Sequence, residues 1–117
     1  MHNTITISTT LRRPLQFSQV EKGIYRSAYV TSRNYEYITL LNLKSMICLS
    51  PSDLRDDLRN FCSSNSINIY EEDVGTNVEP FISMDHGKVK KVISTVTNPI
   101  NQPCLIFCTT GKVRIYF

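Results

Sequence analysis

The sequence predicts an α/β domain in which a parallel sheet is flanked by helices. Short apolar segments of strand length alternate along the chain with segments of helical periodicity. Such alternation is typical of parallel strands joined by helical crossovers. The chain has 117 residues, of which 41% are hydrophobic and 20% are charged, and this suits a single globular domain with its own core. Neither an internal repeat nor a linker divides it.

The first half of the chain contains two expected strands and two expected helices. A short strand is expected around residues 24–25 and another over residues 45–50. Between them, residues 34–43 place three apolar side chains at helical spacing: Tyr37, Leu40 and Leu41. A second helix is expected to begin near Pro51, because Ser50 can cap it and Asp53 suits its first turn. Its apolar face would consist of Leu54, Leu58, Phe61 and Cys62.

The second half of the chain continues the alternation. Residues 67–70 alternate as a strand, and a loop rich in acidic residues follows them. A helix with one apolar stripe comes next and is expected to stop at Asn98 and Pro99. That stripe consists of Val89, Val92, Ile93 and Val96. Residues 104–107 form the last strand, and residues 1–13 are expected to be a flexible arm before a single domain at 14–117.

Composition and charge argue against several classes of function. The net charge of +3 is mild and lacks the basic density of a nucleic-acid-binding surface. No apolar run approaches membrane-spanning length, and the first residues lack the apolar stretch of a secretory signal. A cytoplasmic protein with reduced cysteines is therefore expected. Because the four cysteines and two histidines do not follow a metal-binding spacing, no metal and no cofactor are expected.

The richest chemistry lies after the last apolar strand. Cys108 is followed by a short polar loop and an arginine: Thr109, Thr110, Gly111, Lys112, Val113 and Arg114. A strand that turns through a short loop into a helix directs backbone N–H groups into one concavity, which binds an anion such as phosphate. Such a nest also stabilises a thiolate, so that a cysteine at its mouth is a nucleophile near neutral pH.

Two further residues of this loop support phosphate chemistry. Gly111 lets the backbone approach the ligand closely, and Arg114 can hold two phosphate oxygens with its planar guanidinium group. Together with Cys108 they predict attack on phosphorus through a cysteinyl-phosphate that water hydrolyses. A structural role for Cys108 is the alternative, because cysteine often packs as a small hydrophobic residue and this spacing also arises by chance.

Three further stretches of the chain are distinctive: PLQFSQVEKGIYRS at 14–27, VGTNVEPF at 74–81, and NPINQPCLIFC at 98–108 with the residues that follow it. In this order they resemble the plant and fungal atypical dual-specificity phosphatases, and in particular the fungal branch. That branch includes inositol-pyrophosphate phosphatases and protein-tyrosine phosphatases. The resemblance implies a cysteine-phosphatase fold, hydrolysis of phosphate esters or pyrophosphates without a metal, and association with related phosphatase-like proteins.

The resemblance also implies roles for individual residues. Cys108 would be the nucleophile and Arg114 the phosphate clamp, with residues 109–113 as the substrate-binding loop. A general acid is expected in or beside the loop before the last helix. Asp85 is our choice for that acid, and Glu79 and Asp73 are the alternatives. Each of the three could instead be a solvated loop carboxylate or a helix cap.

The chain departs from the family pattern at several positions. Phe107 stands where the family has a histidine that supports the loop, and Thr109 and Thr110 replace positions that are frequently basic. Ile115 stands where a hydroxyl residue helps the thiolate leave. The chain stops at Phe117, so we expect a truncated domain that lacks the helices normally following the loop. Two hypotheses follow: a cysteine-dependent phosphatase, or a catalytically impaired remnant that binds phosphate or a partner.

Overall fold

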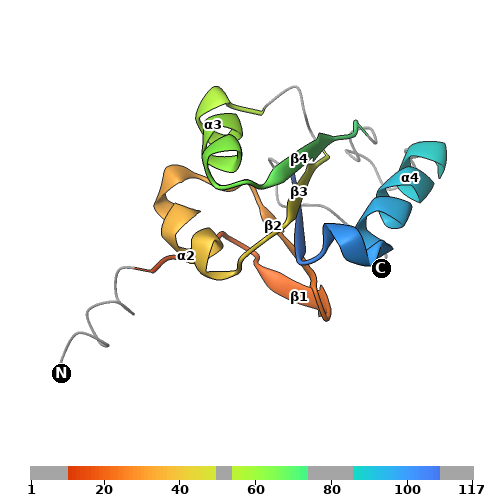
Figure 1. Ribbon diagram of the computed structural model, residues 1–117, viewed down its shortest axis with the longest axis horizontal. Coiled ribbons are helices and arrows are strands. Elements are labelled where there is room, and N and C mark those ends of the chain that lie inside the picture. Colours follow the sequence, from red (N-terminus) through yellow and green to blue (C-terminus); the bar gives the residue numbers. More distant parts are fainter. Residues whose placement is uncertain (1–10, 50–53, 74–85, 109–117) are drawn as a thin grey trace.

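The computed structural model describes residues 11–49, 54–73 and 86–108, which form a five-stranded sheet with helices on both faces (Figure 1). The strands are β1 (Ser18–Glu21), β2 (Ile24–Ala28), β3 (Ser45–Cys48), β4 (Asn68–Glu71) and β5 (Cys104–Cys108). The helices are α2 (Tyr35–Leu40), α3 (Asp56–Ser64) and α4 (His86–Thr97), with two short 3₁₀ helices, η1 (Ser32–Asn34) and η3 (Pro99–Asn101). None of the helices in these ranges is long and apolar enough to cross a membrane.

The strand order is β1-β2-β5-β3-β4, so the last strand of the chain lies at the centre of the sheet. Strands β2, β5, β3 and β4 are parallel, and β1 pairs antiparallel with β2. The expected α/β architecture is confirmed, and the sheet is mostly rather than wholly parallel. The central position of β5 places its carboxyl end between the ends of two neighbouring strands.

One strand was not predicted. Residues 14–27 were expected to contain a single short strand, but they form the β1–β2 hairpin, whose turn includes Gly23. Its φ of +84° is one that glycine adopts without strain. A Cβ on Gly23 would also come within 3.0 Å of the Gln102 side chain, and the Gly23 carbonyl accepts a hydrogen bond from the Cys104 N–H at 2.9 Å. The hairpin turn is therefore fitted against the start of β5.

The core has two parts, one on each face of the sheet. On the α2–α3 face, buried side chains of the sheet pack under the two helices: Met46, Cys48, Leu105 and Phe107 against Ile38, Leu58 and Cys62. On the α4 face, a second buried set packs under the third helix: Ile24, Ile47, Leu49, Cys104, Ile106 and Cys108 against Val92 and Val96. Because side chains alternate along a strand, consecutive residues of β5 contribute to opposite faces.

The helix predictions need two corrections. In α2, Ile38 is fully buried whereas Leu40 is 60% exposed, so the buried side follows Asn34, Ile38 and Leu41 instead of the predicted stripe. Helix α3 begins at Asp56, whereas Leu54 and Arg55 are not helical; the predicted start at 50–53 lies outside the described residues. Arg55 is extended (φ −91°, ψ 151°) and its N–H is bonded outside the helix, while Asp56 and Asp57 are the acids of the first turn.

The segment that leads from α4 into β5 agrees with its prediction except at one residue. Val92 and Val96 of α4 are buried and the helix ends at Thr97, but Ile93 of the predicted stripe is 36% exposed. The Asn98 side chain accepts a hydrogen bond from the Ile100 N–H at 3.1 Å and caps η3, in which Pro99 is the first residue. The chain then enters β5 directly.

Candidate active site

Cys108 is the last residue of the central strand. Its Cα is paired with that of Ala28, the last residue of β2, and on the other side the Leu49 N–H donates to the Phe107 carbonyl at 3.0 Å. In open α/β sheets, ligands bind outside the carboxyl ends of the parallel strands. The side chain of Cys108 is 6% exposed and belongs to the α4 face. The cysteine thus lies at the edge of the sheet where such folds place their chemistry.

The first turns of α4 lie at this same edge. Lys91 Nζ is 3.3 Å from Glu72 Oε2, and Glu72 directly follows β4. The Glu72 N–H in turn donates to the Cys48 carbonyl at the end of β3, at 3.0 Å. The ends of three strands and the start of α4 therefore converge on one edge of the molecule.

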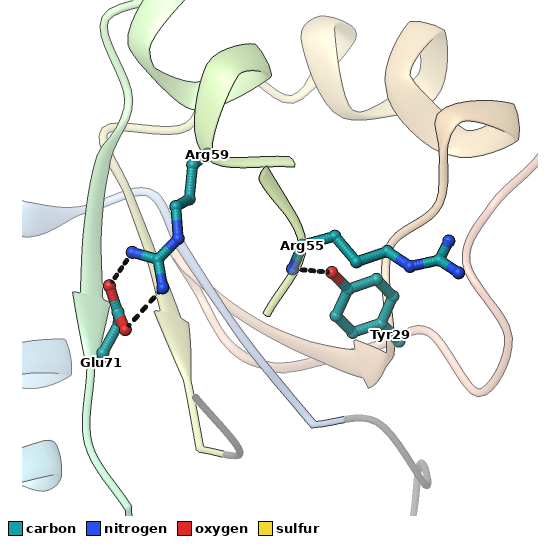
Figure 2. A network of polar contacts seen from close by, with 4 residues as sticks. All are labelled: Tyr29, Arg55, Arg59 and Glu71. Carbon is teal, nitrogen blue, oxygen red and sulfur yellow. Dashed lines mark hydrogen bonds and ion pairs between the residues drawn. The ribbon is translucent and has the colours of Figure 1, made fainter. Parts of the chain in front are cut away.

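Phe107, the residue before Cys108, lies on the opposite face and is fully buried. Its ring meets that of Tyr29 edge to face, with centroids 5.7 Å apart and an interplanar angle of 73°. The Tyr29 hydroxyl accepts a hydrogen bond from the Arg55 backbone N–H at 2.9 Å, as Figure 2 shows. Burial is the main cause that raises the pKa of Tyr29, so this hydroxyl keeps its proton at neutral pH.

Three other cysteines pack in the core, as expected. Burial raises the pKa of Cys62 and of Cys104 to about 11. The Cys62 thiol lies 3.5 Å from the Met46 sulfur, and the Cys104 thiol lies 3.8 Å from the Val96 carbonyl oxygen. Cys48 is likewise fully buried. Cys62 and Cys104 are therefore protonated near neutral pH and act as apolar side chains.

Of the predicted site residues, Cys108 and the alternative acid Asp73 lie in the described part of the chain. Asp73 is exposed and follows β4 at the same carboxyl edge as Cys108, with β3 between their strands. The other predicted residues lie outside the described ranges: Glu79, Asp85, Thr109, Thr110, Gly111, Lys112, Val113 and Arg114. Within the described ranges, no group of three His, Cys, Asp or Glu side chains could hold a metal ion.

A polar and aromatic network on the α2–α3 face was not predicted. Besides the contacts of Tyr29, the Tyr35 ring stacks on Phe61 at 4.1 Å and its hydroxyl donates to Asp57 Oδ2 at 3.1 Å. Both terminal guanidinium nitrogens of Arg59, Nη1 and Nη2, donate to the Glu71 carboxylate (Figure 2). The one available signal was the position of Tyr29 directly after a strand, which places it at the carboxyl edge.

The chain matches the model of the tyrosine phosphatase family over residues 11–116. It belongs to the tyrosine phosphatase family. It is 35% identical to inositol diphosphatase SIW14 of Saccharomyces cerevisiae over 102 residues, which are 86% of this chain and 36% of that protein. It is 29% identical to inositol diphosphatase DSP1 of Oryza sativa over 101 residues, 86% of this chain and 46% of the relative.

A solved structure supports the same assignment. The fold is similar to the core catalytic domain of the inositol-pyrophosphate phosphatase SIW14 from S. cerevisiae in complex with citrate, with a TM-score of 0.81 and 32% identity. The match covers 89% of this chain and 62% of that one. The predicted resemblance and the cysteine-phosphatase fold are thus confirmed. The chain spans about half the length, or less, of these curated relatives.

Proposed function

We propose that this chain is a cysteine-dependent phosphatase that acts on phosphotyrosine or on an inositol pyrophosphate. The observation that carries the proposal is the position of Cys108 at the carboxyl end of the central strand, in a chain of the tyrosine phosphatase family. The names of the relatives support the pyrophosphate substrate, and the family description supports the tyrosine substrate. A cytoplasmic location and association with related phosphatase-like proteins belong to the same proposal.

The proposed reaction has two steps. The Cys108 thiolate attacks phosphorus, so that an S–P bond forms while the bond from phosphorus to the leaving oxygen breaks. Asp85 gives a proton to that oxygen, with Glu79 and Asp73 as alternatives. Water then attacks phosphorus and gives a proton to the carboxylate that lost one, while the S–P bond breaks, which releases inorganic phosphate and restores the thiolate. Arg114 and the loop of residues 109–113 hold the phosphate oxygens in both steps.

The choice between the two substrates has a chemical consequence for the acid. A phosphate that leaves from a pyrophosphate is already a good leaving group, whereas a tyrosine phenolate benefits more from protonation. Loss of Asp85 is therefore expected to slow hydrolysis of a phosphotyrosine peptide more than hydrolysis of an inositol pyrophosphate. One variant that lacks the Asp85 carboxylate can therefore be used to compare how strongly hydrolysis of each substrate depends on the acid.

The first test is the reaction of Cys108 with iodoacetamide between pH 5 and 9, with and without orthovanadate. The Cys108→Ser variant is the blank, and Cys104→Ser is the matched control because Cys104 lies on the same strand and the same face. Since burial raises the pKa of Cys62 and Cys104 to about 11, neither is expected to contribute to alkylation at pH 6.

Two outcomes are possible. Rapid alkylation at pH 6 that vanadate suppresses, and that Cys108→Ser abolishes, would support an anion-binding loop with a reactive thiolate, and turnover of both substrate classes would follow. Slow alkylation that ignores vanadate would overturn the proposal and favour the alternative, an impaired remnant that binds phosphate or a partner. In the active case, Cys108→Ser is expected to lower turnover by roughly 10⁴-fold or more, while Cys104→Ser retains it.

A further inference from the structure

We propose that Tyr29 is a positioning residue for Cys108: it fixes the end of β5 through Phe107 and joins it to the start of α3. This inference rests on the proposed function, because it assigns Tyr29 a role in the reaction of Cys108. Three observations carry it, namely the place of Tyr29 in the sheet, its contact with Phe107, and the hydrogen bond to its hydroxyl group.

Tyr29 follows directly after Ala28, whose Cα is the partner of Cys108 in the parallel β2–β5 pair. It therefore leaves the sheet at the same level as the cysteine, one strand away. The half-buried Tyr29 ring lies on the α2–α3 face. It packs edge to face with the Phe107 ring, with ring centroids 5.7 Å apart. Such aromatic pairs have preferred orientations, so the contact restrains the backbone of β5 next to Cys108.

The side chain of Phe107 cannot form hydrogen bonds, so packing alone holds it in place. It is fully buried, and its backbone carbonyl accepts from the Leu49 N–H at 3.0 Å. Among the described aromatic contacts, the ring of Phe107 pairs only with Tyr29. A shift of Tyr29 would therefore be transmitted to the backbone that carries Cys108.

The hydroxyl group of Tyr29 fixes the tyrosine itself. It accepts the N–H of Arg55, the N-cap residue of α3, at 2.9 Å (Figure 2). In a capping box, the side chain three residues after the N-cap accepts this N–H, but here that residue is Leu58, and Arg55 makes no capping bond with its own side chain. Tyr29, which follows β2, accepts this N–H instead, and so couples the start of α3 to the strand of the nucleophile.

The test compares variants of Tyr29 with matched variants of Tyr35 in the full chain. Tyr35 also binds the start of α3, through Asp57 and Phe61, but its ring stacks on α3 instead of on β5. The variants are Tyr29→Leu, Tyr29→Phe, Tyr35→Leu and Tyr35→Phe. For each, we would measure the alkylation rate of Cys108 against pH, the vanadate concentration that halves it, and the thermal unfolding midpoint.

We expect Tyr29→Leu to lower the alkylation rate at pH 6 and to weaken vanadate protection by about tenfold or more, because small displacements of reacting groups are costly. Tyr29→Phe keeps the ring and loses only the hydroxyl, so a change of about threefold is expected. Tyr35→Leu is expected to lower the unfolding midpoint but to change the Cys108 readouts by less than about twofold, since it leaves Phe107 in place. If Tyr29→Leu does not fold, the two phenylalanine variants decide.

Equal effects of the Tyr29 and Tyr35 variants on Cys108, or none, would overturn the inference while leaving the phosphatase proposal intact. A wild-type Cys108 that reacts slowly and ignores vanadate would overturn the phosphatase proposal, and the positioning role would fail with it. The wild-type measurement therefore distinguishes the two failures.

Discussion

The α2–α3 face and the α4 face of the sheet are built from different side chains and are held by different contacts. The α2–α3 face has tyrosine and phenylalanine rings around its core, and side-chain hydrogen bonds fix its helices. Arg59 of α3 binds Glu71 of β4 with both terminal guanidinium nitrogens. The α4 face is aliphatic apart from its cysteines, and Lys91 of α4, whose side chain is 72% exposed, forms an ion pair with Glu72.

The proposed reactive side chain and the contacts that restrain its strand therefore lie on different faces of the sheet. The side chain that we propose as the nucleophile belongs to the α4 face, while the contacts that restrain its strand lie on the α2–α3 face. Since consecutive residues of a strand point to opposite faces, Phe107 is the link between the two. One residue of β5 is thus held by aromatic packing so that the next can be presented at the edge of the sheet.

The largest predicted effect compares the two faces at neighbouring positions of β5. Both Ile106 and Phe107 are fully buried, but the ring of Phe107 also forms an aromatic pair with Tyr29. Phe107→Ala is expected to lower the free energy of unfolding by about 3–5 kcal/mol and Ile106→Ala by about 2–4 kcal/mol. Urea denaturation would measure both, with Leu40→Ala, at a 60% exposed position, as a control expected to stay within about 0.5 kcal/mol.

A larger loss for Ile106→Ala than for Phe107→Ala would contradict this ordering. It would mean that the α4 face, despite its fewer polar contacts, carries more of the stability. The restraint on Cys108 would then have to come from its own face, and the role given to Phe107 would lose its basis.

The sequence was most informative where a pattern is local. The alternation of strands and helices, most of the stripes of α3 and α4, and the stop of α4 before Asn98 all depend on residues within a few positions of one another. The sequence was less informative where a distant group takes the place of a local one. Leu54 was expected on the helix, yet α3 begins at Asp56, and the N–H of its N-cap residue Arg55 binds the hydroxyl of Tyr29, which follows β2.

The site could be predicted in part for the same reason. The apolar run of β5 ending in Cys108 indicates a strand that delivers a cysteine to the edge of a sheet, and the structure places it there. The partnership of Tyr29 with Phe107 and Arg55 could not be predicted. These residues are far apart in the chain, 26 positions in the case of Tyr29 and Arg55, and no spacing rule links a tyrosine after one strand to a helix start after the next.

A smaller effect is expected from pH, and it tests whether the two faces bury their thiols equally. Cys62 lies on the α2–α3 face and Cys104 on the α4 face, and burial raises the pKa of each from about 9 to about 11. Because the folded state holds these protons more tightly than the unfolded state, stability is fully present below about pH 9 and is lost as the pH rises to 11.

Urea denaturation in a reducing buffer at pH 7, 9, 10 and 11 would measure this loss. Cys62→Ala and Cys104→Ala are each expected to remove part of the alkaline decline, although each also lowers stability at pH 7 by leaving a small cavity. Burial also raises the pKa of Tyr29 and Tyr35, so a residual decline is expected above pH 10 in both variants. A decline that is unchanged in both cysteine variants would show that these thiols are not its source.

The smallest effect concerns two adjacent acids at the end of β4 that bind cations from opposite faces. Glu71 accepts hydrogen bonds from both terminal guanidinium nitrogens of Arg59, and the side chains of Glu71 and Arg59 are 33% and 40% exposed. Glu72 meets the single ammonium of the largely exposed Lys91 at 3.3 Å. Bidentate pairs are stronger than single contacts with a mobile lysine, so Glu71→Gln should lower the unfolding midpoint by about 2 °C and Glu72→Gln by less than about 1 °C.

Thermal unfolding of the two variants at low salt and in 1 M sodium chloride would check this difference, which salt should reduce by screening both pairs. Both substitutions replace glutamate by glutamine at adjacent positions. A difference between their unfolding midpoints therefore reflects the ion pairs on the two faces and not the type of residue replaced. Equal midpoints would mean that the Arg59 contact adds no rigidity to the α2–α3 face. The restraint on β5 would then depend on aromatic packing alone. In that case the effect of Tyr29→Leu on the alkylation rate of Cys108 should exceed that of Tyr29→Phe by a wider margin.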